Sequence, residues 1–212
     1  ALSFACTLQQ QKAMHLLIEY YKTGDLHLFD EYSIEWLKDT ESSIDFINGF
    51  IEVYGDALAY KASWEAVVEI VDKEACERTR KLADNALWFE QHAPIDSRFK
   101  KSEVKGVTAR VMQVAMLGGD CHPATPIGIN LPNAEWIRER YGSKSVTLDN
   151  ITYAYDMAAS SSGVLDEFAA SDEEIQLARE FGSLGSSLHT DLHECLGHGS
   201  GKMLPGVTSE AL

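Results

Sequence analysis

The chain has 212 residues, 45% of them hydrophobic, and a formal net charge of −15 at pH 7. This composition is typical of a globular protein with one large domain or two small ones. The negative charge argues against binding to nucleic acid or to anionic membranes, because both need clusters of Lys and Arg. No apolar run is long enough to span a membrane, so we expect no membrane partner.

The start of the sequence and the cysteines bear on its cellular setting. The sequence ALSFACTLQQ lacks an initiator Met and the basic n-region of a signal peptide, which suggests a segment of a longer protein. The four cysteines, Cys6, Cys76, Cys121 and Cys195, form no CxxC pair. We therefore expect free thiols in a reducing compartment and a cytoplasmic location.

The first predicted elements are two helices. Apolar residues recur at helical spacing over 7–22 and again over 25–38. Gly24 predicts the end of the first helix, and Asp25 predicts the start of the second. We interpret this pair as scaffold.

Two short segments that follow are typical of strands. Residues 50–54 alternate between apolar and polar side chains, and residues 64–71 are rich in β-branched side chains, although helix is the competing interpretation for the second segment. As neighbouring strands they would present Glu52, Tyr54 and Glu65 from a sheet. Spacing alone favours a simple exposed polar face at these positions.

The middle of the sequence predicts one helix from 72 or 73 to 92, the longest in the chain, and a strand over 107–117. Cys121 and His122 could be mistaken for a pair of metal ligands. Adjacent side chains of an extended segment point apart, so we do not assign them a metal.

The prolines in 126–132 favour a loop or an edge strand, because proline cannot pair within a central strand. Asn133 is predicted to cap a helix that runs to about Tyr141, and residues 145–151 are predicted to form another strand. From the residues alone, Asn130 is a turn residue and Asn133 a helix cap.

The Ser-rich stretch 160–163 is the most linker-like part of the sequence. It divides the chain into a mixed α+β part, residues 1–158, and a helical part, residues 159–212.

Within the helical part, a capping box at Ser171 opens a helix to about Phe181. We expect Gly182 and Gly185 to interrupt this helix. The next helix is then predicted to bury the leucines that recur along it, which are Leu184, Leu188, Leu192 and Leu196.

That last helix contains the hexapeptide HECLGH, in which His193 and His198 enclose Glu194. In the common zinc-hydrolase helix the two histidines are four residues apart and share one metal ion. Five residues of a regular helix would leave the two rings about 140° apart. We therefore predict a wide π-type turn here, with Gly197 as the place where the backbone adjusts.

Two other interpretations of the hexapeptide are open. The two histidines could be unrelated surface residues. Alternatively His189 and His193, which share a face of an ordinary helix, could bind the metal, but Thr190 rather than Glu follows His189. We prefer His193 with His198, because hydrolysis needs a base beside the metal.

The run HECLGHGSGK resembles the signature of the dipeptidyl peptidase III family, which has the form HExxGH. The resemblance implies that His193 and His198 bind Zn²⁺ and that Glu194 activates a water molecule. The family's third protein ligand is a Glu in a later motif, which does not occur in this sequence. We therefore expect a missing C-terminal segment to supply that Glu, and we expect this chain alone to be inactive.

Two further segments resemble substrate-binding segments of the same family. FIEVYGD followed by SWEAVV implies that Glu52 binds the peptide amino terminus, that Tyr54 bonds the substrate or its oxyanion, and that Glu65 lies by the same pocket. GINLPN implies that Asn130 and Asn133 bind the amino terminus and the first peptide group.

We predict an α+β fold that is rich in helix, with a small mostly antiparallel sheet or partial β-barrel and a C-terminal zinc-motif helix. The predicted function is that of a zinc-dependent metallopeptidase releasing dipeptides from the amino end of short peptides. The alternative is a non-catalytic zinc- or peptide-binding module that a partner segment completes. A helical interaction domain with coincidental histidines would bind no metal.

Overall fold

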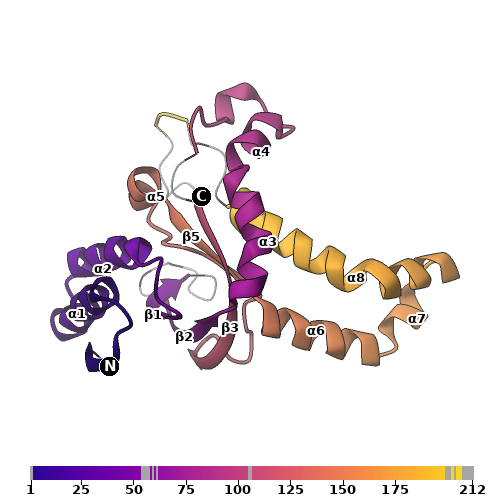
Figure 1. Cartoon of the computed structure of the whole chain (residues 1–212), viewed down its shortest axis with the longest axis horizontal. Helices are drawn as coiled ribbons and strands as arrows, with labels where there is room; N and C mark the ends of the chain where they lie inside the picture. The colour runs from indigo at the N-terminus through magenta and orange to yellow at the C-terminus, as the bar shows by residue number, and fades with distance from the viewer. Residues whose placement is uncertain are drawn as a thin grey trace.

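The computed structural model describes residues 2–53, 58, 60, 62–104, 107–198, 202 and 204–206. A central sheet has α1 and α2 on one side, and α6, α7 and α8 extend away from it on the other (Figure 1). The helices are α1 (Leu8–Thr23), α2 (Leu26–Lys38), α3 (Lys73–Asp84), α4 (Ala86–His92), α5 (Glu135–Tyr141), α6 (Asp149–Ser161), α7 (Val164–Phe168) and α8 (Asp172–Leu192), with short 3-10 turns at Leu2–Phe4 and Ser97–Phe99.

The sheet is open and mostly antiparallel. Its strands lie in the order β1 (Ile44–Glu52), β2 (Ser63–Val71), β3 (Val107–Gly119), β5 (Ser143–Leu148) and β4 (Gly128–Leu131). β3 and β5 pair in parallel, and the other neighbours pair antiparallel. This arrangement confirms the predicted α+β class and places the segments around Glu52 and Glu65 on adjacent strands.

The two N-terminal helices confirm the prediction from helical spacing. The Thr7 side chain caps α1, Gly24 ends it with a φ of 73°, and Asp25 caps α2. Their inner faces pack with β1 and β2 in the larger of two apolar cores, which includes Leu17, Tyr20, Trp36, Ile47 and Val67. This packing gives the sheet a rigid support behind its β1–β2 edge.

Charged side chains are buried beside this core, which the sequence did not predict. The Lys144 ammonium, fully buried on β5, donates to the carbonyls of Trp36 and Asp39 and to the Asp45 carboxylate at 2.8, 3.1 and 3.0 Å. Glu69 lies opposite Asp45 in the β1–β2 register. Neither of its carboxyl oxygens has a hydrogen-bond partner among the described residues. Burial, followed by the Asp45 carboxylate, raises the pKa of Glu69 to about 8.

Several predicted element boundaries are wrong. The strand predicted over 50–54 runs instead from Ile44 to Glu52. The helix predicted to reach residue 92 divides at Asn85, whose side-chain amide donates to the Lys81 carbonyl. Asparagine competes in this way with the helical backbone bonds. The strand predicted over 145–151 ends at Leu148, and α6 begins at once. There the Asn150 side chain accepts from and donates to the backbone of Val114.

The predicted break in the last long helix is also wrong. α8 continues through Gly182 and Gly185, and neither glycine has a positive φ. Glycine inside a helix costs about 1 kcal/mol relative to alanine and does not by itself end it. None of the four leucines predicted to be buried is fully buried: the exposed fractions are 57% for Leu184, 37% for Leu188 and 36% for Leu192, and Leu196 is half-buried.

Two other predictions concern the chain as a whole. The predicted boundary between residues 158 and 159 lies inside α6, and the division into two parts stays a prediction. Each helix in the described ranges is too short or too polar to cross a lipid bilayer.

Candidate active site

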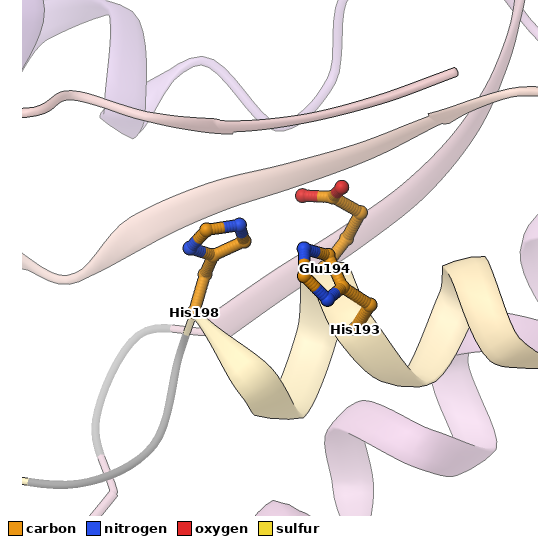
Figure 2. A group of neighbouring side chains, drawn as sticks. All are labelled: His193, Glu194 and His198. Atoms are coloured by element: carbon orange, nitrogen blue, oxygen red, sulfur yellow. The ribbon is translucent and has the colours of Figure 1, made fainter. Parts of the chain in front are cut away.

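The hexapeptide forms the wide turn that its spacing predicts. Residues His193–Gly197 are π-helical, and the His198 amide donates to the His193 carbonyl at 3.0 Å, five residues back. The two imidazole rings lie edge to face, with their centroids 4.6 Å apart. Figure 2 shows both rings and the Glu194 carboxyl projecting from the same side of the turn. A Cβ at Gly197 would make only ordinary contacts with His193, so space does not require glycine there.

This geometry favours the pairing of His193 with His198 over that with His189. Potential ligand atoms of His193, Glu194 and His198 all lie within 4.8 Å of one another, and the described residues contain no other such group. His189 is exposed, and its ring centroid lies 6.3 Å from that of His193. Two imidazole nitrogens beside a carboxyl fit a divalent metal ion of the kind that accepts nitrogen ligands.

The Glu194 side chain is packed against strand β4. It is 6% exposed, and its Oε2 has no hydrogen-bond partner within the part of the chain that the structure describes. A Cβ at Gly128 would lie only 2.6 Å from the Glu194 Cδ, so the carboxyl occupies space that any other residue at 128 would fill. Burial raises the pKa of Glu194 to about 7.

One cavity of about 410 Å³ extends from the π-helical turn of the hexapeptide to strands β1 and β2. Its lining brings together residues that the family resemblance assigns to one site but that lie far apart in sequence. These are Glu52, Glu65, Asn130, Asn133, Glu194 and His198. Tyr54 lies outside the described residues. β4 and β5 pack against the turn, and the cavity extends from there to the end of β1 at Glu52 and the start of β2 near Glu65.

Asn130 is in strand β4 rather than in a turn, and its side chain is 9% exposed. Its amide Nδ2 donates to the Ser145 hydroxyl at 2.7 Å, the Ser143 hydroxyl at 3.2 Å and the Glu194 carbonyl at 3.3 Å. The Asn130 Oδ1 has no partner among the described residues. Asn130 lines the cavity, and its Oδ1 is a buried acceptor that the described residues leave unused.

Asn133 does not cap α5, contrary to the prediction. The residue at the N-cap is Ala134, and the exposed Asn133 amide donates instead to the Ile51 carbonyl at 3.4 Å. The bond joins the β4–α5 loop to β1 across the cavity. The rest of the GINLPN segment agrees with the prediction, since residues 128–131 form an edge strand and Gly142 ends α5.

Comparison with known proteins identifies the family. The model of Peptidase family M49 matches residues 1–211. The chain belongs to this family. M49 is a family of metallopeptidases that includes dipeptidyl peptidase III, so the predicted resemblance is confirmed.

Named relatives agree. The chain is 30% identical to dipeptidyl peptidase 3 of Dictyostelium discoideum over 203 residues, covering 96% of this chain and 28% of that protein. It is 27% identical to the human dipeptidyl peptidase 3 over 204 residues, covering 96% and 27%. The solved structure of DPP III from Caldithrix abyssi superposes with a TM-score of 0.75 at 26% identity over 94% of this chain and 37% of that chain. This M49 chain thus spans little more than a quarter of the curated relatives.

Asp120, which the sequence analysis missed, adds a fourth carboxyl group to the cavity of this M49 chain, after Glu52, Glu65 and Glu194. Burial, followed by the charges of Glu52 and Asp120, raises the pKa of Glu65. The Cys121 thiol lies 4.0 Å from Glu65. The only sequence signal for Asp120 was a Gly-Gly-Asp turn, which predicts a loop but not the carboxylates across from it.

Arg138 was also missed. From α5, its guanidinium donates to the His198 carbonyl at 2.5 Å and lines the cavity. Burial, then the neighbouring His193 and Arg138, lowers the pKa of His198. The helix 135–141 was predicted, but no spacing pattern shows that one of its arginines reaches the turn sixty residues later.

Proposed function

We propose that this chain carries the metal-binding helix and the amino-terminal half of the peptide site of a zinc-dependent dipeptidyl peptidase. The observation that supports this most directly is the shared cavity. It connects Glu194 and His198 at one end with Glu52 and Glu65 at the other. A peptide bound there would have its ammonium group beside the carboxylates and an early peptide bond beside the turn.

His193 and His198 would hold the metal ion, and zinc suits a pair of imidazoles. When bound, the ion supplies a Lewis acid that polarises the scissile carbonyl and lowers the pKa of a water molecule. Catalytic zinc sites generally use three protein ligands. We propose that the third is a Glu in a part of the family fold outside residues 1–212.

Glu194 acts as the general base in this proposal. Its carboxyl lies beside both imidazoles, and its packing against Gly128 aims it into the cavity. It takes a proton from the attacking water and delivers it to the leaving amine. Tyr54 is proposed to donate a hydrogen bond to the oxyanion.

The carboxylates at the far end would select the amino terminus. An α-ammonium group is bound well by partly buried carboxylates, since charge-assisted bonds are strong where water is limited. Glu52 is proposed as the main partner, with Glu65 beside it. Asn130 would accept from the substrate through its Oδ1, and Asn133 would bind the first peptide group. Together they set the position of the scissile bond relative to the chain end.

The test is the products and rates of a full-length protein that contains this chain. Incubated with a pentapeptide, the protein should release the amino-terminal dipeptide first, and N-acetylation of the pentapeptide should abolish cleavage. Glu194→Gln should lower kcat by about 1,000-fold while the metal content stays the same. Cleavage of the acetylated peptide at an equal rate would refute recognition of the amino terminus.

A non-catalytic metal- or peptide-binding module is the second candidate. The observation that favours it is the number of possible metal ligands. His193, Glu194 and His198 could together hold an ion without any catalytic step. A binding module does not need a base. Glu194→Gln would therefore leave its peptide affinity intact, and the wild-type protein would show no peptide cleavage. We expect residues 1–212 alone to release no dipeptide at a stoichiometric zinc load.

The free thiols of Cys6, Cys76 and Cys121 suit a reducing compartment, and we propose the cytoplasm.

A further inference from the structure

The wide turn leaves the Glu194 carbonyl without the backbone hydrogen bond that it would have in an ordinary α-helix. In an α-helix the His198 amide would donate to the Glu194 carbonyl, four residues back. Here it donates to the His193 carbonyl instead. The Glu194 carbonyl therefore loses this donor, although Glu194 is only 6% exposed. Buried carbonyl groups are almost always hydrogen-bonded, because an unpaired one is costly.

Two side chains of the sheet supply donors to this carbonyl. The Ser145 hydroxyl, on β5, donates to it at 2.7 Å, and the Asn130 amide, on β4, donates at 3.3 Å. Ser145 is 1% exposed, so water does not compete for the bond. Both donors come from strands that pack against the turn, β5 and β4.

Asn130 also orients the serine. Its amide donates to the Ser145 oxygen at 2.7 Å, so that oxygen accepts one hydrogen bond and its own hydroxyl hydrogen points to the Glu194 carbonyl. The direction of both bonds is therefore determined: from Asn130 to Ser145, and from Ser145 to Glu194. At the end of the same turn, Arg138 binds the His198 carbonyl in a similar way.

We propose that Ser145, oriented by Asn130, is a positioning residue that stabilises the π-helical turn and so places His193 and His198 on one metal ion. Its importance for catalysis rests on the proposed function. Its importance for the turn does not, because the bonds exist in the chain itself. Ser145 does not contact the reacting atoms and is not a catalytic residue.

Ser143 provides a matched control on the same strand. It is a buried serine, 4% exposed, two residues from Ser145, and it accepts from the same Asn130 amide at 3.2 Å. Among the described residues, however, the side-chain donors to the Glu194 carbonyl are Ser145 and Asn130. Loss of the hydroxyl at 143 should therefore spare the turn.

The experiment measures two properties of the wild-type chain and of Ser145→Ala, Ser145→Thr and Ser143→Ala. The first is the Kd for Zn²⁺ from a chelator competition. The second is the hydrogen-exchange rate of the His198 amide without metal, measured by NMR. Ser145→Ala should weaken zinc binding about tenfold and speed the exchange about tenfold, the effect of losing one buried hydrogen bond. Ser145→Thr, which keeps the hydroxyl, and Ser143→Ala should both stay within about threefold of wild type.

Equal effects of Ser145→Ala and Ser143→Ala, or no change in His198 exchange in Ser145→Ala, would overturn the proposal. If Ser145→Ala does not fold, Asn130→Asp replaces it, because a carboxylate would accept the hydrogen bond from the Ser145 hydroxyl and so draw that donor away from the Glu194 carbonyl. Faster His198 exchange is then expected, and unchanged exchange overturns the proposal. A wild-type chain that binds no zinc would count against the proposed function alone, since the exchange measurement would still decide the inference.

Discussion

The sheet and the arm formed by α6, α7 and α8 differ in which side chains they bury. In the sheet, polar and charged side chains are buried, and the Lys144 ammonium and the Asn130 amide nitrogen donate hydrogen bonds there. The Glu69 carboxyl is buried in the sheet without a partner among the described residues. In the arm, apolar groups are exposed, as for Phe168 and Leu184. α8 belongs to both regions, because its C-terminal end packs on β5 through Thr147 and Asp191 while the rest extends away (Figure 1). The π-helical turn and the end of α8 are therefore held by hydrogen bonds to the sheet, and the apolar face of the helix takes little part in them.

Among the single substitutions at neutral pH, the largest expected loss of stability comes from removing a buried hydrogen bond between α8 and the sheet. Asp191 is fully buried and accepts from the Thr147 hydroxyl at 2.9 Å. Asp191→Ala should lower the free energy of unfolding by about 3 kcal/mol, because buried polar partners are left unpaired. Urea denaturation measures this. The control is Asp166→Ala in the arm, where an exposed ion pair with Arg179 is lost, and the change should be below about 0.5 kcal/mol. Equal losses would remove the contrast between the two regions.

The sheet should also make stability depend on pH. Glu69 faces the charges of Asp45, Lys144 and Arg110, and its folded pKa is raised to about 8. A raised carboxyl pKa means that the folded state holds the proton more tightly than the unfolded state. Its stabilising contribution is complete below about pH 4.5 and falls by about 1.4 kcal/mol per pH unit up to about pH 8.

Denaturation curves between pH 5 and pH 8 test this slope. In Glu69→Gln the part of the slope that comes from this group should disappear. An identical pH dependence in wild type and Glu69→Gln would show that Glu69 is ionised in the folded protein.

Replacing a glycine by alanine should have opposite effects on stability in the two regions. Gly128→Ala places a methyl group in the space of the Glu194 carboxyl and should destabilise the fold by about 1–2 kcal/mol. Gly182→Ala in α8 meets nothing within 4 Å and should stabilise the fold by about 0.5–1 kcal/mol through helix propensity. Thermal melting of both variants is the measurement. Destabilisation by both would indicate that α8 needs its glycines.

The smallest expected effect is on the arm surface. Leu184→Gln exchanges a side chain that is 57% exposed and should change the free energy of unfolding by less than about 0.5 kcal/mol. Val146→Ala, at a fully buried position of β5, should cost about 1–3 kcal/mol. A large loss in Leu184→Gln would mean that the arm is covered by apolar contacts in solution.

The sequence predicted the turn correctly because its spacing leaves few options. Two histidines five residues apart reach one metal ion only through a widened turn, and the i to i+5 bond from His198 is what the structure contains. The two N-terminal helices and the paired strands around Glu65 were predictable for a similar reason, since their periodicity and caps are local signals.

The sequence did not reveal what holds the turn in place. Ser145 and Arg138 belong to elements far from the hexapeptide in sequence, and a serine in a strand or an arginine in a short helix has no spacing signature. The burial of the α8 leucines was predicted wrongly for the opposite reason. Their helical period is real, but period alone does not show whether a surface packs on that face.

The central claim is that the wide turn places His193 and His198 on one metal ion. The most direct test is the tightly bound zinc per chain in wild type, His198→Ala and His189→Ala, after dialysis against a weak chelator. We predict that His198→Ala loses the metal and that His189→Ala, which removes an exposed histidine on the preceding turn, keeps it. Retention of zinc by His198→Ala together with its loss from His189→Ala would contradict the account and assign the metal to an ordinary i, i+4 pair.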